Sequence, residues 1–250
     1  VSEDVLPEFQ RFSRSFNGMI DRLDAGFTAQ RQFTGNAAHE LRTPLALMQA
    51  QLELFSAEHA DVTPETAAFL SLLQEQTERM AQMTKILLEM SELRTVPCDD
   101  RVELAPMIEE IFTDLAPLAE SKCIALEADG GAVLTGSDPL LYRLLFNLTE
   151  NAIKYNRTGG SVEVSVEQEG DQAAIRVRDT GPGIAEEYRD SIFQPFFRVD
   201  KSRSRAMGGV GLGLALVKEI PRLHGGTVRV EQSTDTGTTI LVTLPVGKAA

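Results

Sequence analysis

The stretch His39-Glu40-Leu41-Arg42-Thr43-Pro44-Leu45 lies inside a long helical repeat and is the most informative part of the sequence. A proline in a helix interior costs roughly 3 kcal/mol, because it removes one backbone hydrogen bond and clashes with the preceding turn. The bond lost here runs from residue 44 to the carbonyl of Glu40. The sequence therefore predicts a helix break beside His39, and this placement disfavours a merely structural role for that histidine.

Apolar residues on both sides of this stretch recur at steps of four and three, which is typical of a coiled coil or four-helix bundle. The first series is Phe27, Thr34, Ala37, Leu41, Leu45, Met48, Leu52 and Phe55, and the second is Phe69, Leu73, Gln76, Met80, Met83, Leu87 and Met90. Thr63 and Pro64 fit the N-cap and first residue of a helix, so residues 27–96 should form an antiparallel hairpin. Because one hairpin cannot bury two broad apolar seams, we expect a homodimer that forms a four-helix bundle.

Beyond a linker at residues 95–100, apolar and polar residues alternate with period two, which predicts half-buried antiparallel strands. The alternating residues are Val162, Val164 and Val166, then Ile175 and Val177, then Val228 and Val230, then Ile240 and Val242. Helical patterns intervene at about 106–120, 138–155 and 211–223. The fold class is therefore α+β: a helical hairpin followed, over residues 97–250, by an α/β sandwich with helices on one sheet face.

Composition excludes several classes of protein. A net charge of −13, from 24 basic and 37 acidic residues, argues against direct nucleic-acid binding. The two cysteines form no disulfide framework and suit a reducing compartment. No apolar run approaches the roughly 20 residues that span a bilayer, so this stretch should be soluble. Because the chain starts at Val1 rather than methionine, we expect it to be a piece of a longer protein.

His39 lies two positions before the seam residue Leu41, or about 200° around the helix, and should face solvent. A neutral imidazole is a competent nucleophile at physiological pH, and Glu40 can accept a proton or orient a neighbouring group. Neither His59 nor His224 is followed by such a carboxylate, and both are expected to be ordinary solvated histidines.

A polar stripe marks the predicted helix at 138–155. Asn147, Asn151 and Lys154 occupy positions i, i+4 and i+7 on a face separate from the apolar stripe. Two amide oxygens one turn apart can hold a hydrated Mg²⁺, and a lysine beyond them can meet phosphate. Taken alone, such a stripe is most often a solvated helix face.

Two glycine-rich segments follow. In Asp179-Thr180-Gly181-Pro182-Gly183 the glycines permit close approach of a ligand, and the carboxylate can accept a hydrogen bond from an amine such as that of adenine. The run from Gly208 to Gly213 opens a helix whose free amides suit phosphate. Phe193, Phe196 and Phe197 are expected in the core. A basic cluster could neutralise a triphosphate; its members are Arg198, Lys201, Arg203 and Arg205.

Taken together and in this order, these segments resemble the sensor histidine kinases of bacterial two-component systems. Residues 39–45 resemble their H box, 147–155 the N box, 179–183 the first glycine box, 193–198 the F box, 209–214 the second glycine box, and 237–239 the last glycine-threonine motif. The resemblance covers residues 10–245. Each motif alone is a weak signal, but six motifs in this order and spacing identify the family specifically.

The resemblance implies a dimerisation and histidine-phosphotransfer hairpin joined to a catalytic ATP-binding domain of the gyrase and histidine-kinase type. Residues 1–26 resemble the end of a HAMP signalling segment, so the full-length protein should be anchored in the inner or plasma membrane with this portion in the cytoplasm. By analogy, His39 accepts the phosphoryl group, Glu40 assists as acid and base, and Thr43 orients water for dephosphorylating the partner. That partner is a response-regulator receiver domain, which takes the phosphoryl group on an aspartate.

The resemblance also implies the ligands ATP and Mg²⁺. Asn147 and Asn151 would serve the metal, Lys154 and Arg198 the phosphates, and Asp179 the adenine amine, with Thr238 supporting the base. The other residues expected at the nucleotide are Tyr155, Gly181, Gly183, Gly209, Gly211, Leu212 and Gly213. One departure from the family pattern is Pro221, which is expected to interrupt and kink the helix after the second glycine box.

Two other functions fit parts of the sequence. A gyrase-like or chaperone-like ATPase would share the nucleotide fold, but it needs no phosphoacceptor histidine on a hairpin. A dimeric scaffold that senses nucleotide without transferring phosphate would not need Asn147, Asn151 and Asp179 to be intact. An ATP-dependent protein-histidine kinase accounts for all of these features.

Overall fold

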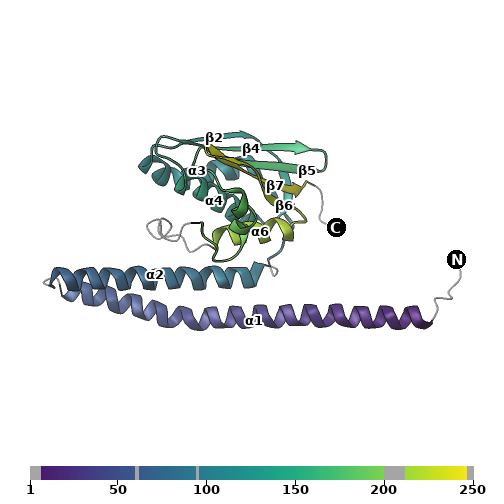
Figure 1. Cartoon of the computed structure of the whole chain (residues 1–250), viewed down its shortest axis with the longest axis horizontal. Helices are drawn as coiled ribbons and strands as arrows, with labels where there is room; N and C mark the ends of the chain where they lie inside the picture. The colour runs from purple at the N-terminus through teal and green to yellow at the C-terminus, as the bar shows by residue number, and fades with distance from the viewer. Residues whose placement is uncertain (1–6, 60–61, 94–95, 200–211, 247–250) are drawn as a thin grey trace. The chain divides into compact units, whose positions relative to one another are not determined.

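A computed structural model describes residues 7–59, 62–93, 96–199 and 212–246 of the 250-residue chain. The chain divides into two compact units, Val1–Glu92 and Leu93–Ala250, drawn in Figure 1. The first is helical and the second contains all the strands that the structure describes.

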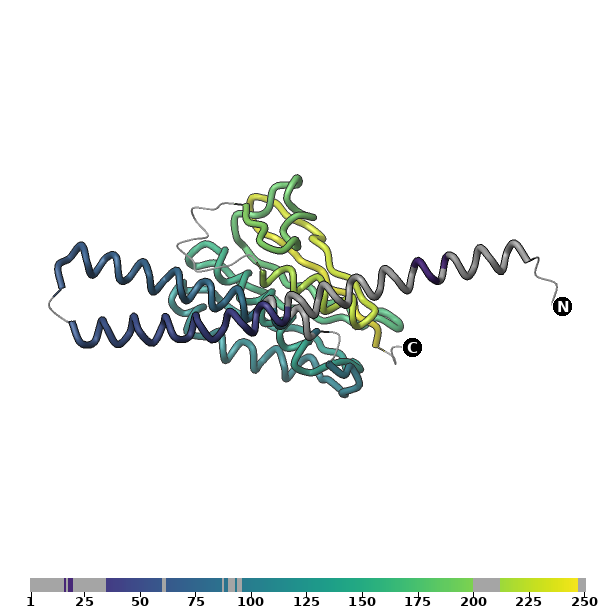
Figure 2. Tube along the Cα trace, turned by 90° about the horizontal axis from the view of Figure 1, so that it is seen from below, coloured from purple at the N-terminus to yellow at the C-terminus, as the bar shows by residue number. Residues whose placement is uncertain are grey.

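The first unit is a helical hairpin, as the sequence predicts. Helix α1 (Pro7–Glu58) is followed by α2 (Pro64–Glu92), which runs back along the C-terminal part of α1 (Figure 2). Thr63 caps α2, since its Oγ1 accepts a hydrogen bond from the N–H of Thr66 at 3.3 Å. The predicted start of the second helix is therefore confirmed.

The helix break predicted at Pro44 is wrong, because α1 continues through this residue without interruption. The two flanks of the proline are fixed by packing in the hairpin, where Ala38 and Leu45 are each only 2% exposed. Burial of these flanks offsets the single backbone hydrogen bond that Pro44 removes.

The second unit is an α/β sandwich whose elements fill the predicted domain. Its strands are β1 (Asp100–Glu103), β2 (Ala125–Gly130), β3 (Val133–Gly136), β4 (Ser161–Glu169), β5 (Gln172–Asp179), β6 (Thr227–Thr234) and β7 (Gly237–Pro245). Its helices are α3 (Leu104–Ser121), α4 (Asp138–Lys154) and α6 (Gly213–Leu223), with short 3₁₀ turns η2 (Glu186–Tyr188) and η3 (Ser191–Phe193).

Within the described residues, the main sheet has five strands in the order β2-β4-β5-β7-β6, and β1 pairs with β3 separately. The strands β4, β5, β7 and β6 pair antiparallel, as predicted for these segments, while β2 runs parallel to β4. Helices α3, α4 and α6 lie together on one face of the main sheet (Figure 1). The alternating residues Val162, Val164 and Val166 are at most 3% exposed, so the predicted inward face of this strand is confirmed.

Pro221 does not interrupt its helix, since α6 continues to Leu223. The proline lies in the last turn, so only two residues of the helix follow the one backbone bond that it removes, and its side chain is buried. The expectation of a helix broken at this residue is therefore wrong.

His224 is buried rather than solvated, with 4% of its surface exposed, so this prediction is also wrong. Its Nε2 accepts a hydrogen bond from the backbone N–H of Ser137 at 3.0 Å. The other ring nitrogen, Nδ1, therefore carries the proton and donates to the carbonyl of Ile220 at 2.8 Å. The imidazole joins the end of α6 to the start of α4. His59, in contrast, is exposed as expected.

Replacing His224 with leucine should destabilise the second unit by about 3 kcal/mol, because the N–H of buried Ser137 would lose its acceptor. The measurement is denaturant unfolding, followed by circular dichroism. The control is His59→Leu at an exposed site, which should change stability by roughly 0.5 kcal/mol or less. Equal stability of the two variants would contradict the role assigned to His224.

Candidate functional site

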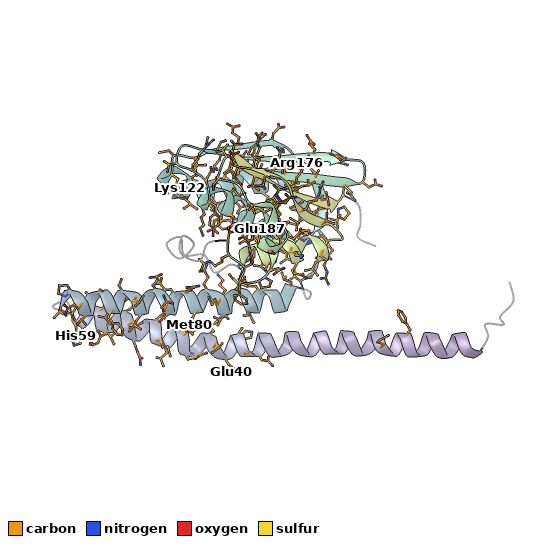
Figure 3. All side chains as sticks on the ribbon, in the orientation of Figure 1. Glu40, His59, Met80, Lys122, Arg176 and Glu187 are labelled. Atoms are coloured by element: carbon orange, nitrogen blue, oxygen red, sulfur yellow. The ribbon has the colours of Figure 1, made fainter. Side chains whose placement is uncertain are left out.

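The first candidate site lies on α1, where His39, Glu40 and Thr43 are all exposed. Figure 3 labels Glu40 on this helix. The buried residues Ala38 and Leu45 hold this segment against the hairpin, while His39 faces solvent as predicted. Thr43 lies one turn beyond His39 on the same side of the helix. The structure thus exposes an imidazole and the adjacent carboxylate on one helix.

The second candidate site begins on α4, where Asn147 and Asn151 are half-buried. The amide nitrogen of Asn147 donates to the carbonyl of Arg143 at 2.7 Å, and that of Asn151 to the carbonyl of Asn147 at 2.8 Å. Because both nitrogens are engaged with the helix backbone, each side chain presents its oxygen as an acceptor.

Gly213, the first residue of α6, lies against these asparagines. A Cβ atom at this position would come within 2.8 Å of Asn147 Oδ1 and 3.9 Å of Asn151 Nδ2. A side chain here would therefore displace Asn147. The structure thus brings the predicted metal ligands together with the helix that follows the predicted phosphate loop.

The donor chemistry of this pair fits Mg²⁺, which takes oxygen ligands, keeps several waters and binds through few protein groups when phosphates complete its shell. No group of three or more His, Cys, Asp or Glu residues arranged for a metal occurs in the described part of the chain. Lys154, one turn beyond Asn151, pairs with Glu150 at 2.9 Å, and both side chains are about a quarter exposed.

Asp179 ends β5, and its carboxylate is held by backbone amides. Its Oδ1 accepts hydrogen bonds from the N–H of Gly181 at 2.8 Å and of Thr238 at 3.3 Å. Among the described residues, no donor is bonded to its other oxygen, Oδ2. Burial raises the pKa of Asp179, and the two N–H groups oppose this rise only in part. Oδ2 is therefore a partly desolvated acceptor suited to a donor group on a ligand.

Close backbone packing shapes the turn after Asp179. A Cβ atom on Gly181 would come within 3.0 Å of the Tyr155 carbonyl, at the end of α4. Gly183 has a φ of +77°, and a Cβ atom there would lie 1.8 Å from the carbonyl of Thr234. These approaches require glycine, and they bring the ends of α4, β5 and β6 together.

Thr238 lies beside Asp179 in the paired strands β5 and β7. Its hydroxyl bonds to Ser233 Oγ at 2.9 Å, and Ser233 Oγ in turn accepts from the N–H of Ile184 at 2.7 Å. Thr238 thus supports Asp179 through its backbone and the following loop through its side chain. Ser233 has no local sequence signal, because its role depends on pairing across strands.

The two halves of the second site share α4. Asn147 and Tyr155 are eight residues apart, or roughly 12 Å along the helix axis. A ligand with an amine-bearing ring at Asp179 could therefore extend along α4 and carry its anionic end toward Asn147 and Asn151. A purine nucleoside triphosphate has this polarity.

The remaining predicted residues take varied positions. Tyr155 is exposed and Arg198 is half-buried, while Leu212 is fully buried. Gly209 and Gly211 lie outside the described residues, as do Lys201, Arg203 and Arg205.

The three phenylalanines of the F-box region differ from one another. Phe193 is buried, as expected. Phe197 is half-buried and packs against Tyr188 with ring centroids 5.8 Å apart. Phe196 is 52% exposed, so its assignment to the core is wrong. Its φ of 64° places its backbone in the left-handed region, so the direction of its side chain does not follow from the pattern of a regular helix or strand.

Lys122 contacts the end of α4, a contact that the sequence analysis did not predict. Figure 3 labels it after α3, and its Nζ donates to the carbonyls of Ile153 and Lys154 at the end of α4, the first at 3.2 Å. Burial, followed by repulsion from Lys154, lowers the pKa of Lys122. Its partners are backbone carbonyls distant in sequence, so no local pattern marks this cap.

Comparisons with known families match both units. Residues 29–95 match the family described as His Kinase A (phospho-acceptor) domain, and residues 136–248 match Histidine kinase-, DNA gyrase B-, and HSP90-like ATPase. The predicted hairpin followed by a sandwich of the gyrase and histidine-kinase type is therefore confirmed.

Individual relatives agree with these family matches. Sensor histidine kinase RppB of Synechocystis sp. is 36% identical over 226 residues, which cover 88% of this chain and 50% of RppB. Sensor protein CutS of Streptomyces coelicolor is 35% identical, with 96% of this chain and 58% of CutS covered. The chain thus spans half of RppB and little more of CutS.

Among solved structures, the mycobacterial sensor histidine kinase MprB is 30% identical with a TM-score of 0.51, covering 59% of this chain and 97% of that structure. Full-length ShkA in complex with AMPPNP has a TM-score of 0.67 and covers 88% of this chain and 46% of that chain; at 24% identity it shows the fold alone. None of the helices that the structure describes combines the length and apolar character needed to cross a membrane.

Proposed function

Because the chain belongs to the sensor histidine kinases of two-component systems, we propose that it transfers the γ-phosphoryl group of ATP to His39 and then to an aspartate of a response-regulator receiver domain. The observation that carries this proposal is the exposed pair His39 and Glu40 on a hairpin, in a chain that also holds the oxygen-lined site of Asn147, Asn151 and Asp179.

In this proposal, Asp179 Oδ2 accepts the amine of adenine, because this oxygen is partly desolvated while backbone amides hold its partner Oδ1. Asn147 and Asn151 would hold Mg²⁺, which when bound would offset the charge of the phosphates. Lys154 would exchange its pairing with Glu150 for a phosphate oxygen, and Arg198 would add a second positive charge. The glycine run that ends at Gly213 would donate backbone N–H groups to the same phosphates.

The phosphoryl transfer is a displacement at the γ-phosphorus. A ring nitrogen of His39 bonds to the phosphorus as the bond to the bridging oxygen breaks, and ADP leaves with that electron pair. Glu40 takes the proton from the other ring nitrogen, so the phosphorylated ring carries no excess positive charge. The proximity of Glu40 and the exposure of His39 support these roles.

The hairpin leaves apolar side chains exposed, which supports the proposed homodimer. They are Leu41, Leu47, Met48, Leu54 and Phe55 on α1, and Phe69, Leu72, Leu73 and Met80 on α2. Many exposed apolar side chains on a helical pair are usually covered by a partner, and a second hairpin would complete a four-helix bundle.

The double change Leu73→Glu and Met80→Glu should convert the dimer into a monomer, because it would place four charges in the apolar interior of the bundle. Light scattering after size-exclusion chromatography measures the change. Ser71→Glu adds charge at an exposed polar position of the same helix and should remain dimeric. A doubly substituted chain with the mass of a dimer would argue against this interface.

We also propose that Thr43 orients water for dephosphorylating the regulator, since its side chain is exposed one helical turn from His39.

The proposed domain limits are those expected from the sequence: a HAMP-like signalling end at 1–26, the phosphotransfer hairpin at 27–96 and the catalytic domain at 97–250. The relatives' sensor names support membrane anchoring of a longer protein, with the present segment in the cytoplasm.

The function is tested by incubating the chain with Mg²⁺ and γ-labelled ATP, and then treating the labelled protein with acid and alkali. We expect label that acid removes and alkali does not, and that a receiver domain accepts. Steady release of phosphate without labelled protein would instead favour a gyrase-like ATPase. Nucleotide binding with neither label nor turnover would favour a nucleotide-sensing scaffold.

A further inference from the structure

The turn between α4 and β4 contains a buried asparagine that the proposed chemistry does not use. Asn156 is 8% exposed, and its Nδ2 donates to the carbonyl of Ser161 at 2.9 Å. Its Oδ1 accepts from the N–H of Arg157 at 2.9 Å and from the hydroxyl of Thr180 at 3.2 Å. Both ends of this amide are therefore engaged, which fixes its orientation.

Thr180 is the second member of this arrangement and lies between Asp179 and Gly181. Its hydroxyl oxygen accepts from the N–H of Ser161 at 2.9 Å while its proton is donated to Asn156 Oδ1. The backbone N–H of Thr180 also donates to the carbonyl of Ser161 at 3.2 Å. We name the pair Asn156 and Thr180 the clasp, because it fastens the end of α4 to the turn that begins at Asp179.

Neighbouring glycines leave room for the clasp. A Cβ atom on Gly160 would come within 2.5 Å of Asn156 Oδ1 and 2.6 Å of Thr180 Oγ1, so a side chain there would force the two groups apart. Gly181 would meet Asp179 Oδ1 at 2.9 Å and the Cα of Asn156 at 3.5 Å. The backbone at Gly160 is therefore packed closely against the clasp, and that at Gly181 against both the carboxylate and Asn156.

We propose that Asn156 and Thr180 are positioning residues that fix Asp179 and thereby set the preference for adenine over a 6-oxopurine. This inference rests on the proposed function, in which Asp179 accepts the adenine amine. A carboxylate oxygen held in place attracts an amine but repels the carbonyl oxygen that inosine or guanine presents at the same ring position. The better the carboxylate is fixed, the larger this discrimination becomes.

The clasp reaches Asp179 through the adjacent peptide unit and does not require its own contact with the nucleotide. Loss of the Thr180 hydroxyl would leave the carboxylate chemically unchanged but would allow the Asp179 turn to shift relative to α4. Such a shift would weaken the amine contact and relax the repulsion of the carbonyl. Base selectivity therefore distinguishes a positioning role from a purely structural one.

The test compares ATP with inosine triphosphate, which carries a carbonyl oxygen in place of the amine. Affinities of the 250-residue chain for both nucleotides are measured by titration calorimetry with Mg²⁺. We expect Thr180→Val to bind ATP about tenfold more weakly and inosine triphosphate within about twofold of the original affinity. Thr180→Ser, which keeps the hydroxyl, should restore selectivity. Thr158→Val, at an exposed position in the same turn, should change neither affinity.

The outcomes separate the two proposals. An original chain that binds neither nucleotide overturns the proposed function and this inference with it. If the original chain prefers ATP and the Thr180→Val variant prefers it to the same extent, only the positioning role is overturned. This holds even if the melting temperature of the variant falls. If Thr180→Val does not fold, Asn156→Ala is measured in the same way, because it removes the acceptor of the clasp and leaves Thr180 bonded to Ser161. Unchanged selectivity in that variant also overturns the inference.

Discussion

Replacing His39 with glutamine should abolish labelling of the chain by γ-labelled ATP, a loss of about 1000-fold or more. Glutamine keeps a polar side chain of similar reach but offers an amide nitrogen, whose lone pair is delocalised and is not a nucleophile. Because His39 is exposed, the change removes no core contact, and the fold of the hairpin should be unaffected. ATP affinity should also remain within about twofold, since the proposed nucleotide contacts lie on the second unit.

His59→Gln is the matched control for this prediction. His59 is also exposed, directly after the end of α1, but it stacks on Phe55 with ring centroids 4.3 Å apart, and its adjacent carboxylate, Glu58, precedes the histidine instead of following it. It should retain full labelling. Persistent acid-labile label on His39→Gln would move the phosphoacceptor to another histidine and remove the basis of the proposed transfer.

The sequence predicted the fold best where local pattern and tertiary packing agree. The alternation around Val164 and the helical stripe around Leu144 correspond to β4 and α4, because both residues lie in the core that the pattern implies. Strand β2 was missed because its residues are mostly exposed and carry little alternation. Its parallel pairing with β4 is a contact between distant segments, which no short window records.

Errors arose where packing overrides local preference. Pro44 carries a real cost for a helix, but the buried flanks at Ala38 and Leu45 keep α1 continuous. His224 has no neighbouring residues in sequence that predict a buried hydrogen bond. Its ring is nevertheless buried, because the fold brings the N–H of Ser137 within hydrogen-bond distance of Nε2. A single sequence shows which residues such a contact involves, but it does not show that the fold brings them together.

The candidate site shows the same division. Asp179 and its glycines form one short motif, so their association was visible in sequence. The supports of that motif were not, since Asn156, Ser233 and Lys122 act through backbone groups on other elements. Sequence reasoning thus found the residues suited to contact a ligand, while the structure was needed to find those that hold them.

Replacing Asp179 with asparagine should weaken ATP binding by about 100-fold and, at neutral pH, stabilise the unliganded second unit by about 1 kcal/mol. In the variant, the amide oxygen would continue to accept from Gly181 and Thr238, so the amide nitrogen would take the place of Oδ2. A donor would then face the donor amine of adenine, and the contact would become repulsive. The gain in stability follows because a partly buried charge is removed.

The stability gain should depend on pH in a defined direction. Burial raises the pKa of Asp179 in the folded chain above its value in the unfolded chain. The stability that protonated Asp179 contributes is therefore complete below the ordinary aspartate pKa and is lost as pH rises through the raised value. Asp179→Asn should consequently match the original chain in acid and become the more stable of the two as pH rises through this window.

Thermal melting of both proteins across that pH range, with calorimetric titration of ATP at neutral pH, checks the two effects together. Asp171→Asn removes an exposed carboxylate between β4 and β5 and should change neither quantity. A variant at Asp179 that binds ATP normally would exclude the carboxylate as the contact for the base. A variant that loses both ATP binding and stability would instead make Asp179 a structural anchor of the turn, because the removal of a partly buried charge alone cannot lower the stability of the unliganded fold.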